Sequence, residues 1–301
     1  MNRVSSLLCP VVLEGDTIRV LDETLLPHRE VYLAVHTIEE AQRVLKNMNT
    51  RALGQVLLFF YSCLLFKEQF SIEEIVERFR AMRPTFDFPL LGQLIRRGLR
   101  QQKNMNSVIE SFINDFDKAR RQRAEVLATL LPQEAHILTI CNVNGELIYL
   151  YEALKKIGKS AFFYVCETRP YLQGTRLTFW ELRRNNIDCK LICINQAAPL
   201  MRDGYINCVV TGADRATEKG DIINKIGTYS LARLAHYFKI PFYPLVQYPK
   251  DVDVDTIPIE QRPKQEVFMF LEGNFNDIEA VYPSFDVTSF GFVTKCVELP
   301  L

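Results

Sequence analysis

Residues 135–141, AHILTIC, open a series of five short apolar runs that set the architecture of this chain. The other four are SAFFYVC at 160–166, CKLICI at 189–194, INCVVTG at 206–212 and PFYPLVQY at 241–248. Segments with helical spacing of apolar residues separate the runs, a pattern typical of βαβ units and of a parallel sheet with helices on both faces. The sequence therefore predicts an α/β fold with a doubly wound, Rossmann-like parallel sheet in its C-terminal part.

The residues before this series show a different pattern. Residues 11–20, VVLEGDTIRV, alternate between apolar and polar on both sides of a turn-forming trio, which predicts a small β-hairpin. Thr37 with Glu40, and Ser71 with Glu74, match the capping box that begins a helix. From residue 51 to about 131 we expect only helices.

Leu131–Pro132 marks the predicted domain boundary, because proline cannot continue the helical pattern that reaches it. We therefore predict a hairpin followed by a mainly helical domain at 1–131, and a Rossmann-like catalytic domain at 132–301. The end of the helical part carries a basic run, which reads more readily as a solvated helix face than as a protein-contact surface. Its members are Lys118, Arg120, Arg121 and Arg123.

Composition excludes several classes of protein. The 301 residues include 36 Lys+Arg and 36 Asp+Glu, and a net charge of zero argues against a protein that coats nucleic acid or an anionic membrane. The longest apolar stretch, 56–66, is about half of the ~20 residues that a membrane-spanning helix needs, and no leader pattern opens the chain. Cysteines within apolar runs indicate reduced thiols and a cytosolic protein. The spacing of the 4 histidines and of Cys189 and Cys193 predicts no metal site.

Polar and charged side chains follow four of the apolar runs, where an open parallel sheet binds its ligands. They are Cys141–Asn142, Glu167–Pro170, Asn195–Gln196 and Gly212–Arg215. Because the carboxyl ends of parallel strands share one edge of the sheet, we expect these groups to converge there. A thiol, two carboxylates and two guanidiniums at one edge indicate a functional site.

Cys141 and Asp214 are the two candidates for chemistry. A helix that begins near Asn144 would favour the thiolate of Cys141 through its free N–H groups, although a buried, inert thiol is the commoner case. Asp214 closes an apolar run, and a carboxyl partly removed from water there would have a raised pKa suited to a general acid. The alternatives for Asp214 are a helix N-cap and an ion pair with Arg215.

Residues 220–228, GDIINKIGT, predict a glycine-flanked helix start with Asn224 and Lys225 in its first turn. Backbone donors, helix dipole and ammonium would together suit a phosphate, and the alternative is a solvated lysine on a surface helix. Arg51, next to Ala52, and Arg83 read by themselves as surface arginines.

Longer strings resemble a known family. ETRPYLQGTRLTFWEL at 167–182, TGADRATEKGDIINKIGTYSLARLA at 211–235 and IPIEQRP at 257–263 are similar to the methylthioribose-1-phosphate isomerases. Related families are the ribose-1,5-bisphosphate isomerases and the regulatory subunits of translation initiation factor 2B. With VLDETLLP at 20–27 and FDVT at 285–288, the resemblance covers nearly the whole chain.

The resemblance implies an aldose–ketose isomerase of methionine salvage that acts on a small-molecule sugar phosphate. It implies a cytoplasmic homodimer without a cofactor, a nucleic-acid partner or a membrane partner. Catalytic roles fall on Cys141 and Asp214. Substrate contacts fall on Arg51, Ala52, Arg83, Gln173, Asn224 and Lys225.

The implied chemistry explains these residue types. A furanose 1-phosphate cannot open as a free hemiacetal, so an acid must protonate the ring oxygen, and Asp214 is the candidate. Hydrogen then moves from C2 to C1 as a proton or as a hydride, and a Cys141 thiolate suits either route. Charge-assisted bonds from Arg51, Arg83 and Lys225 would hold the phosphate.

Some strings depart from the family pattern. The string that begins at Arg51 is RALGQVL, where the family has R-G-A-P-A-I-G. Ile140 precedes Cys141 at a position where histidine is common in the family. One interpretation is an isomerase for a related pentose 1-phosphate. The alternative is a catalytically silent sugar-phosphate or nucleotide-binding regulatory protein like the initiation factor subunits. The presence of both Cys141 and Asp214 favours the enzyme.

Overall fold

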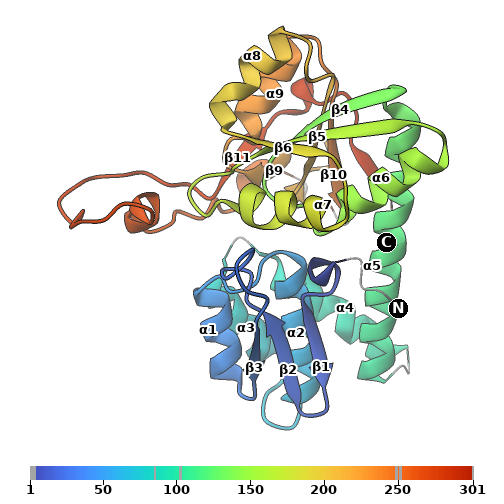
Figure 1. The fold of residues 1–301 in the computed structure, drawn as a ribbon. Coiled ribbons are helices and arrows are strands. Elements are labelled where there is room, and N and C mark those ends of the chain that lie inside the picture. The colour runs from blue at the N-terminus through green and yellow to red at the C-terminus, as the bar shows by residue number, and fades with distance from the viewer. Residues whose placement is uncertain (1–4, 85, 102–103, 248–249, 251–252, 300–301) are drawn as a thin grey trace. The chain divides into compact units, whose positions relative to one another are not determined.

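The computed structural model describes residues 5–84, 86–101, 104–247, 250 and 253–299. The chain forms two compact units, unit 1 (Met1–Lys118) and unit 2 (Ala119–Leu301), each described by itself (Figure 1). Within the described residues, no helix is both long and apolar enough to span a membrane.

Unit 1 combines a small antiparallel sheet with helices. Its strands are β1 (Val11–Glu14), β2 (Thr17–Leu21) and β3 (Tyr32–Val35), in the order β1-β2-β3. The predicted hairpin is confirmed, and β3 is an addition that the sequence did not predict. The helices are α1 (Ile38–Lys46), α2 (Leu53–Leu65), α3 (Ile72–Met82), α4 (Phe88–Arg100) and the first part of α5 (Met105–Leu130).

Both predicted helix starts in unit 1 are present. The Ser71 hydroxyl accepts from the Glu74 N–H while the Glu74 carboxylate accepts from the Ser71 N–H, which completes a capping box at α3. At α1, Thr37 caps the Glu40 N–H, but the Glu40 carboxylate accepts from the His36 N–H instead. The capping signals therefore located both starts correctly, with one variation in the reciprocal bond.

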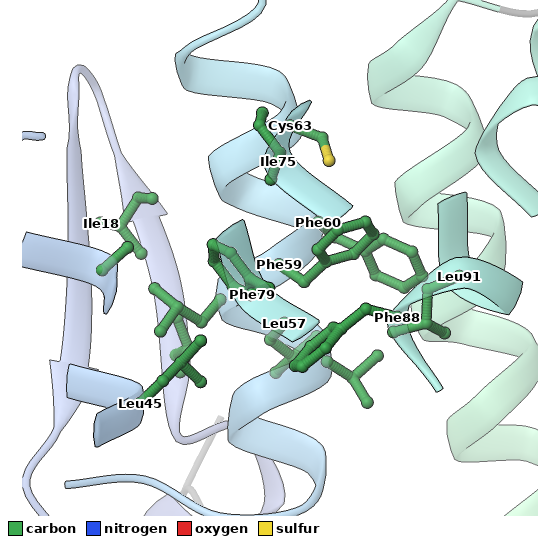
Figure 2. Close-up of a cluster of buried hydrophobic side chains, with 14 of the residues drawn as sticks. Ile18, Leu45, Leu57, Phe59, Phe60, Cys63, Ile75, Phe79, Phe88 and Leu91 are labelled. Atoms are coloured by element: carbon green, nitrogen blue, oxygen red, sulfur yellow. The ribbon is translucent and has the colours of Figure 1, made fainter. Parts of the chain in front are cut away.

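The core of unit 1 is built around α2, which contacts β1 and β2 as well as α3 and α4. Four phenylalanine rings from α2, α3 and α4 gather there (Figure 2). Ring centroids lie 5.5 Å apart for Phe59 and Phe79, and 5.3 Å apart for Phe79 and Phe88, both in edge-on geometry. Because α2 has partners on several sides, it is apolar nearly all round without being a membrane segment.

Unit 2 is built on a six-stranded parallel sheet with the order β12-β10-β7-β4-β5-β6. The five predicted runs all form strands, which are β4 (Glu134–Thr139), β5 (Ser160–Cys166), β6 (Cys189–Ile192), β7 (Cys208–Gly212) and β10 (Phe242–Gln247). The short β12 (Val297–Leu299) completes the sheet. Short 3-10 helices lie at Ser6–Leu8, Ile194–Gln196, Val254–Thr256, Lys264–Phe268 and Phe290–Phe292.

The helices of unit 2 alternate with these strands, as the doubly wound α/β prediction requires. They are α6 (Glu146–Lys156), α7 (Trp180–Arg184), which continues a π-helix at Gly174–Phe179, α8 (Ala197–Arg202) and α9 (Thr228–Tyr237). The chain steps from β4 to β5 and β6 in one direction, then returns to β7 on the other side of β4. The strand order thus reverses between β4 and β7, and their carboxyl ends flank the switch point where such sheets bind ligands.

A second, antiparallel sheet corrects one prediction. It consists of β8 (Arg215–Ala216), β9 (Ile222–Lys225) and β11 (Phe285–Thr288). The predicted helix start at 220–228 was wrong for Asn224 and Lys225, because both lie on β9, paired with β11. The helix begins only at Thr228, after Gly227 with φ +104°. The Asp286 carboxylate of β11 accepts from the N–H groups of Gly227 and Tyr229, and so sets that start.

The C-terminal part of α5 belongs to unit 2, so the two units divide inside this helix, and the domain bounds 1–131 and 132–301 stay a prediction. The basic run of α5 makes contacts within unit 2, which explain why this part of the helix belongs to that unit. Arg123 donates to both carboxylate oxygens of Glu146 at 2.7 and 3.1 Å, and Arg120 donates to the Asn144 carbonyl at 2.7 Å. The solvated-face interpretation was wrong for these two arginines, which are 3% or less exposed.

Candidate active site

Cys141 lies just beyond β4 in a tightly held turn. Its φ is +64°, a left-handed conformation that a side chain makes costly. The Cys141 N–H donates to the Thr168 hydroxyl at 2.9 Å, and its carbonyl accepts from the Thr178 hydroxyl at 2.6 Å. Two threonines from the segment after β5 therefore hold the thiol-bearing residue at the carboxyl edge of the sheet.

The loop after Cys141 leads into a helix, as predicted. The Asn142 side chain accepts from the Asn144 N–H at 2.9 Å, and α6 begins at Glu146. Burial raises the pKa of Glu146, while the charge of Arg123 opposes that effect. The ion pair between Arg123 and Glu146 thus ties the start of α6 to α5, and the loop that carries Cys141 is fixed at both ends.

Cys141 differs from the core thiols of unit 2. Cys166 and Cys208 are fully buried, and burial raises the pKa of each to about 12, so they remain protonated and inert. Cys141 is half-buried at the edge of the sheet instead. Its location fits the reactive interpretation of this thiol better than that of a core cysteine.

Asp214 follows β7, the neighbour of β4, so the two candidates for chemistry leave adjacent strands. Its N–H donates to the Ile223 carbonyl at 2.9 Å, which fixes the backbone against β9. The side chain is exposed, and the expected partial removal from water was wrong for this structure. The N-cap alternative was also wrong, because Asp214 is followed by β8 rather than by a helix.

Asn224 approaches this edge from β9. It is buried, and its amide donates to the Thr228 hydroxyl at 3.0 Å. A Cβ added to Gly212 would lie 2.9 Å from Cγ1 of Val143 and 4.0 Å from Oδ1 of Asn224. Glycine at the end of β7 therefore lets the Cys141 loop and the Asn224 amide come close together.

Lys225 is buried rather than solvated, which corrects the surface-lysine alternative. Its Nζ donates to the phenol oxygen of Tyr282. The ammonium also lies 4.8 Å from the ring centroid of Tyr282 and 5.9 Å from that of Tyr171, at cation–π distances. Burial raises the pKa of Tyr282, and the charge of Cys141 is among the smaller causes, so Lys225, Tyr282 and Cys141 share one neighbourhood.

Gln173 supplies a buried acceptor on the other side of β4. It precedes the π-helix after β5 and is 4% exposed. Among the residues that the structure describes, its Oε1 has no hydrogen-bond partner. A buried amide oxygen without a partner costs free energy unless a ligand or water satisfies it, so Gln173 is suited to a substrate hydroxyl.

The candidate residues of unit 1 form a separate cluster around a buried carboxylate. Glu23 accepts from the Thr50 hydroxyl at 2.7 Å and from the Arg51 N–H at 3.0 Å, and its other oxygen lies 3.7 Å from Nη1 of Arg51. Burial raises the pKa of Glu23, and the charge of Arg51 opposes the effect. Ala52 caps α2 with φ +38°.

Arg83 is linked to the same cluster through Met48 and Gln55. Its Nη1 lies 2.6 Å from the Met48 sulfur, Met48 contacts the side chain of Gln55, and Gln55 donates to the Thr50 carbonyl at 2.9 Å. Arg83 is 5% exposed and the Arg51 side chain 13%. Reading both as surface arginines was therefore wrong.

In the described part of the chain, no three or more His, Cys, Asp or Glu side chains are arranged to hold a metal ion.

Three sequence comparisons bear on this site. Residues 92–298 match the family model described as the initiation factor 2 subunit family. Over 96% of this chain and 93% of the relative, the sequence is 36% identical to a methylthioribose-1-phosphate isomerase of Anaeromyxobacter sp. (strain Fw109-5). It is 32% identical to the Aquifex aeolicus enzyme of the same name, over 96% of this chain and 67% of the relative.

Two solved structures share the fold. The 5-methylthioribose 1-phosphate isomerase of Pyrococcus horikoshii OT3 superposes with a TM-score of 0.77 at 27% identity, covering 96% of this chain and 90% of that one. The delta subunit of translation initiation factor 2B from A. fulgidus superposes with a TM-score of 0.75 at 25% identity, covering 96% and 93%. Both an isomerase and an initiation factor subunit are thus similar to this chain along nearly its whole length.

Proposed function

This chain belongs to the initiation factor 2 subunit family, and from its similarity to methylthioribose-1-phosphate isomerases we propose that it is an aldose–ketose isomerase acting on a furanose 1-phosphate. The substrate is methylthioribose 1-phosphate or a related pentose 1-phosphate, and the product is the open-chain ketose 1-phosphate. One observation carries the proposal. In a chain similar over nearly its whole length to methylthioribose-1-phosphate isomerases, Cys141 and Asp214 follow the two strands that flank the switch point.

The catalytic roles follow from the bonds that must change. Asp214 gives a proton to the ring oxygen while the bond from C1 to that oxygen breaks. Hydrogen then moves from C2 to C1, and the C2 hydroxyl loses its proton as it becomes the ketone, so no oxidant or reductant is needed. Cys141 acts as the base for a proton route, or as the charge that assists a hydride route.

The substrate-binding roles rest on the resemblance and on burial. Lys225 and Asn224 lie buried beside the Cys141 loop, where a cation and an amide suit a phosphate, and Gln173 offers an acceptor for a hydroxyl. In unit 1 we assign substrate contacts to Arg51 and Arg83, which suit an anion, and to the backbone at Ala52. We propose that the enzyme works without a cofactor, because the product is an isomer of the substrate and the reaction involves no net oxidation or reduction.

Phosphorus NMR tests the reaction directly. The protein is mixed in turn with methylthioribose 1-phosphate, 5-deoxyribose 1-phosphate and ribose 1,5-bisphosphate. A new ketose 1-phosphate resonance with one of them is the expected result. Binding without a new resonance from any of the three would favour the second candidate, a silent regulatory protein, which the likeness to the initiation factor 2B subunit supports.

Variants test the two catalytic roles. Asp214→Asn and Cys141→Ser are each expected to lower kcat by about 100-fold or more, because neither replacement supplies the proton donor or the thiolate. Cys193→Ser is the matched control, since that thiol is exposed. Wild-type turnover in either catalytic variant would refute the role assigned to that residue.

We also propose a cytoplasmic homodimer that binds neither nucleic acid nor membrane, with residues 1–131 serving as a hairpin–helical domain and residues 132–301 as a Rossmann-like catalytic domain. All eight cysteines are free thiols, in keeping with a reducing compartment. Size-exclusion chromatography with light scattering gives the mass in solution. A mass of one chain would exclude the dimer.

A further inference from the structure

A network of charged and phenolic groups lies next to Lys225, and neither the reaction nor the resemblance assigns it a role. Arg262 is at its centre. Its guanidinium donates to Glu260 at 2.8 Å, to both carboxylate oxygens of Glu266, one of them at 3.1 Å, and to the phenol oxygen of Tyr171 at 3.0 Å. The side chains of Arg262, Glu260 and Glu266 are 14%, 8% and 16% exposed.

The network reaches Lys225 through two tyrosines. The Tyr171 ring, whose hydroxyl is bound by Arg262, lies 5.9 Å from the Lys225 ammonium. The backbone N–H of Arg262 also donates to the Tyr282 carbonyl at 2.9 Å, and the Tyr282 hydroxyl accepts from Lys225. Arg262 therefore holds one tyrosine by its side chain and the other by its backbone, and both rings lie at cation–π distance from the ammonium.

The phenols remain neutral in this setting. Burial raises the pKa of Tyr171 and the Glu266 carboxylate raises it further, against the opposing effect of the Arg262 hydrogen bond and charge. Burial likewise raises the pKa of Tyr282, and the charges of Tyr171 and Glu266 raise it further by smaller amounts. A neutral phenol fixes the direction of an ammonium and does not cancel its charge. A carboxylate in the same place would cancel it. The hydrogen bond from Lys225 to Tyr282 therefore fixes the direction of the ammonium without adding a further negative charge beside it, whereas the charge of Lys225 already acts on the Asp286 carboxylate.

We propose that Tyr282, supported by Tyr171 and Arg262, is a positioning residue that orients the Lys225 ammonium toward the phosphate of the substrate. The inference rests on the proposed function for the identity of the anion. It explains why IPIEQRP at 257–263 lies beside the site, because Glu260 and Arg262 of that string secure the tyrosines. It also assigns Tyr282 a role that no motif in the sequence suggests.

The test is a double-variant cycle read by binding. Calorimetric titration with methylthioribose 1-phosphate compares the wild type with Tyr282→Phe, Lys225→Met and the double variant. Tyr282→Phe keeps the ring and loses only the hydroxyl, so we expect Kd to rise about tenfold, and kcat to change less than KM. In the Lys225→Met background the same change is expected to have no further effect on Kd, because the group that it positions is gone.

Two further variants complete the design. Tyr171→Phe loses the Arg262 bond but keeps its ring over the ammonium, so a smaller rise in Kd, about threefold, is expected. Tyr237→Phe is the control, because that side chain is 78% exposed. Inorganic phosphate is titrated in parallel. A similar rise in its Kd shows that the loss of affinity concerns the phosphate group and not the sugar.

Each outcome bears on one proposal or the other. Additive effects of Tyr282→Phe and Lys225→Met on Kd, or an unchanged Kd in Tyr282→Phe, would overturn the positioning role. A wild type that binds neither the sugar phosphate nor inorganic phosphate would overturn it as well. Coupled binding effects in a wild type that shows no turnover would support the positioning role while the isomerase proposal fails.

Discussion

Arg51 in unit 1 and Lys225 in unit 2 are two cations assigned to the same kind of ligand, yet the protein holds them differently. Arg51 faces the buried carboxylate of Glu23 at 3.7 Å. Lys225 donates to the phenol of Tyr282 and lies at cation–π distance from the rings of Tyr282 and Tyr171, and its charge also acts on the Asp286 carboxylate. The first arrangement pairs a cation directly with a carboxylate, and the second fixes the direction of an ammonium through a neutral hydroxyl.

The difference indicates two kinds of contribution. The contacts of Arg51 and Thr50 with Glu23 join the entry of α2 to the residues after β2, so this pair serves the stability of unit 1. The contacts of Lys225 orient its ammonium beside the Cys141 loop. Substitutions in the two clusters should therefore separate an effect on stability from an effect on binding, and the following predictions run from the largest effect to the smallest.

Glu23→Ala should cause the largest loss of stability. It leaves the Arg51 guanidinium and the Thr50 hydroxyl without their buried acceptor, which typically costs about 3–5 kcal/mol. Urea denaturation followed by circular dichroism measures the loss. The control is Glu39→Ala, whose carboxylate pairs with Arg78 at the surface and should be worth less than about 1 kcal/mol. Equal losses in the two variants would contradict the structural role of Glu23.

Methionine at the two cation positions compares the clusters directly. Arg51→Met leaves a buried carboxylate, so we expect a loss of about 2–3 kcal/mol, whereas Lys225→Met places an apolar chain between aromatic rings and should change stability by less than about 1 kcal/mol. Binding should weaken in both variants. A larger loss of stability in Lys225→Met would reverse the comparison.

The loss in Arg51→Met should also depend on pH. Burial already raises the pKa of Glu23, and removing the Arg51 charge raises it further. A carboxyl with a raised folded pKa contributes stability that is present below its unfolded pKa and is lost as the pH rises through the folded value. Urea denaturation should therefore show a smaller loss at about pH 5 than at about pH 8. A loss that is independent of pH would contradict the buried-carboxylate explanation.

Asp286, next to Lys225, should give the smallest effect. Burial raises the pKa of Asp286 to about 6, against the hydrogen bonds from Gly227 and Tyr229 and the charge of Lys225. Its contribution to stability is therefore present below the unfolded value near 4 and is lost as the pH rises through about 6. Asp286→Asn should reduce the change in the free energy of unfolding between these two pH values. If the pH profile of the variant matches that of the wild type, Asp286 is not the source of the pH dependence of stability in this range.

Much of the fold was predictable because its signals are local. The five apolar runs, the hairpin and the two helix starts each follow from spacing within a few residues, and all are present. Cys141 and Asp214 could be assigned to one sheet edge because parallel strands present their carboxyl ends together. Neither assignment needed a partner from elsewhere in the chain.

The errors occurred where distant residues decide the outcome. Asn224 and Lys225 lie on a strand because β11, far along the chain, pairs with them. The burial of Arg51 depends on Glu23, 28 residues away, and that of Arg123 on Glu146, 23 residues away. Local spacing carries no record of such partners, and so it assigned these cations to the surface.

By itself, the sequence determined a doubly wound α/β unit after a hairpin and helices, with a thiol and a carboxyl at the edge where such sheets bind ligands. Only the tertiary structure decided how the cations are held. The bond from Lys225 to Tyr282 spans 57 residues, and the bond from Arg262 to Tyr171 spans 91. The physical reason is that a buried charge takes its properties from the groups that folding brings around it, and their identity is not encoded in its own segment.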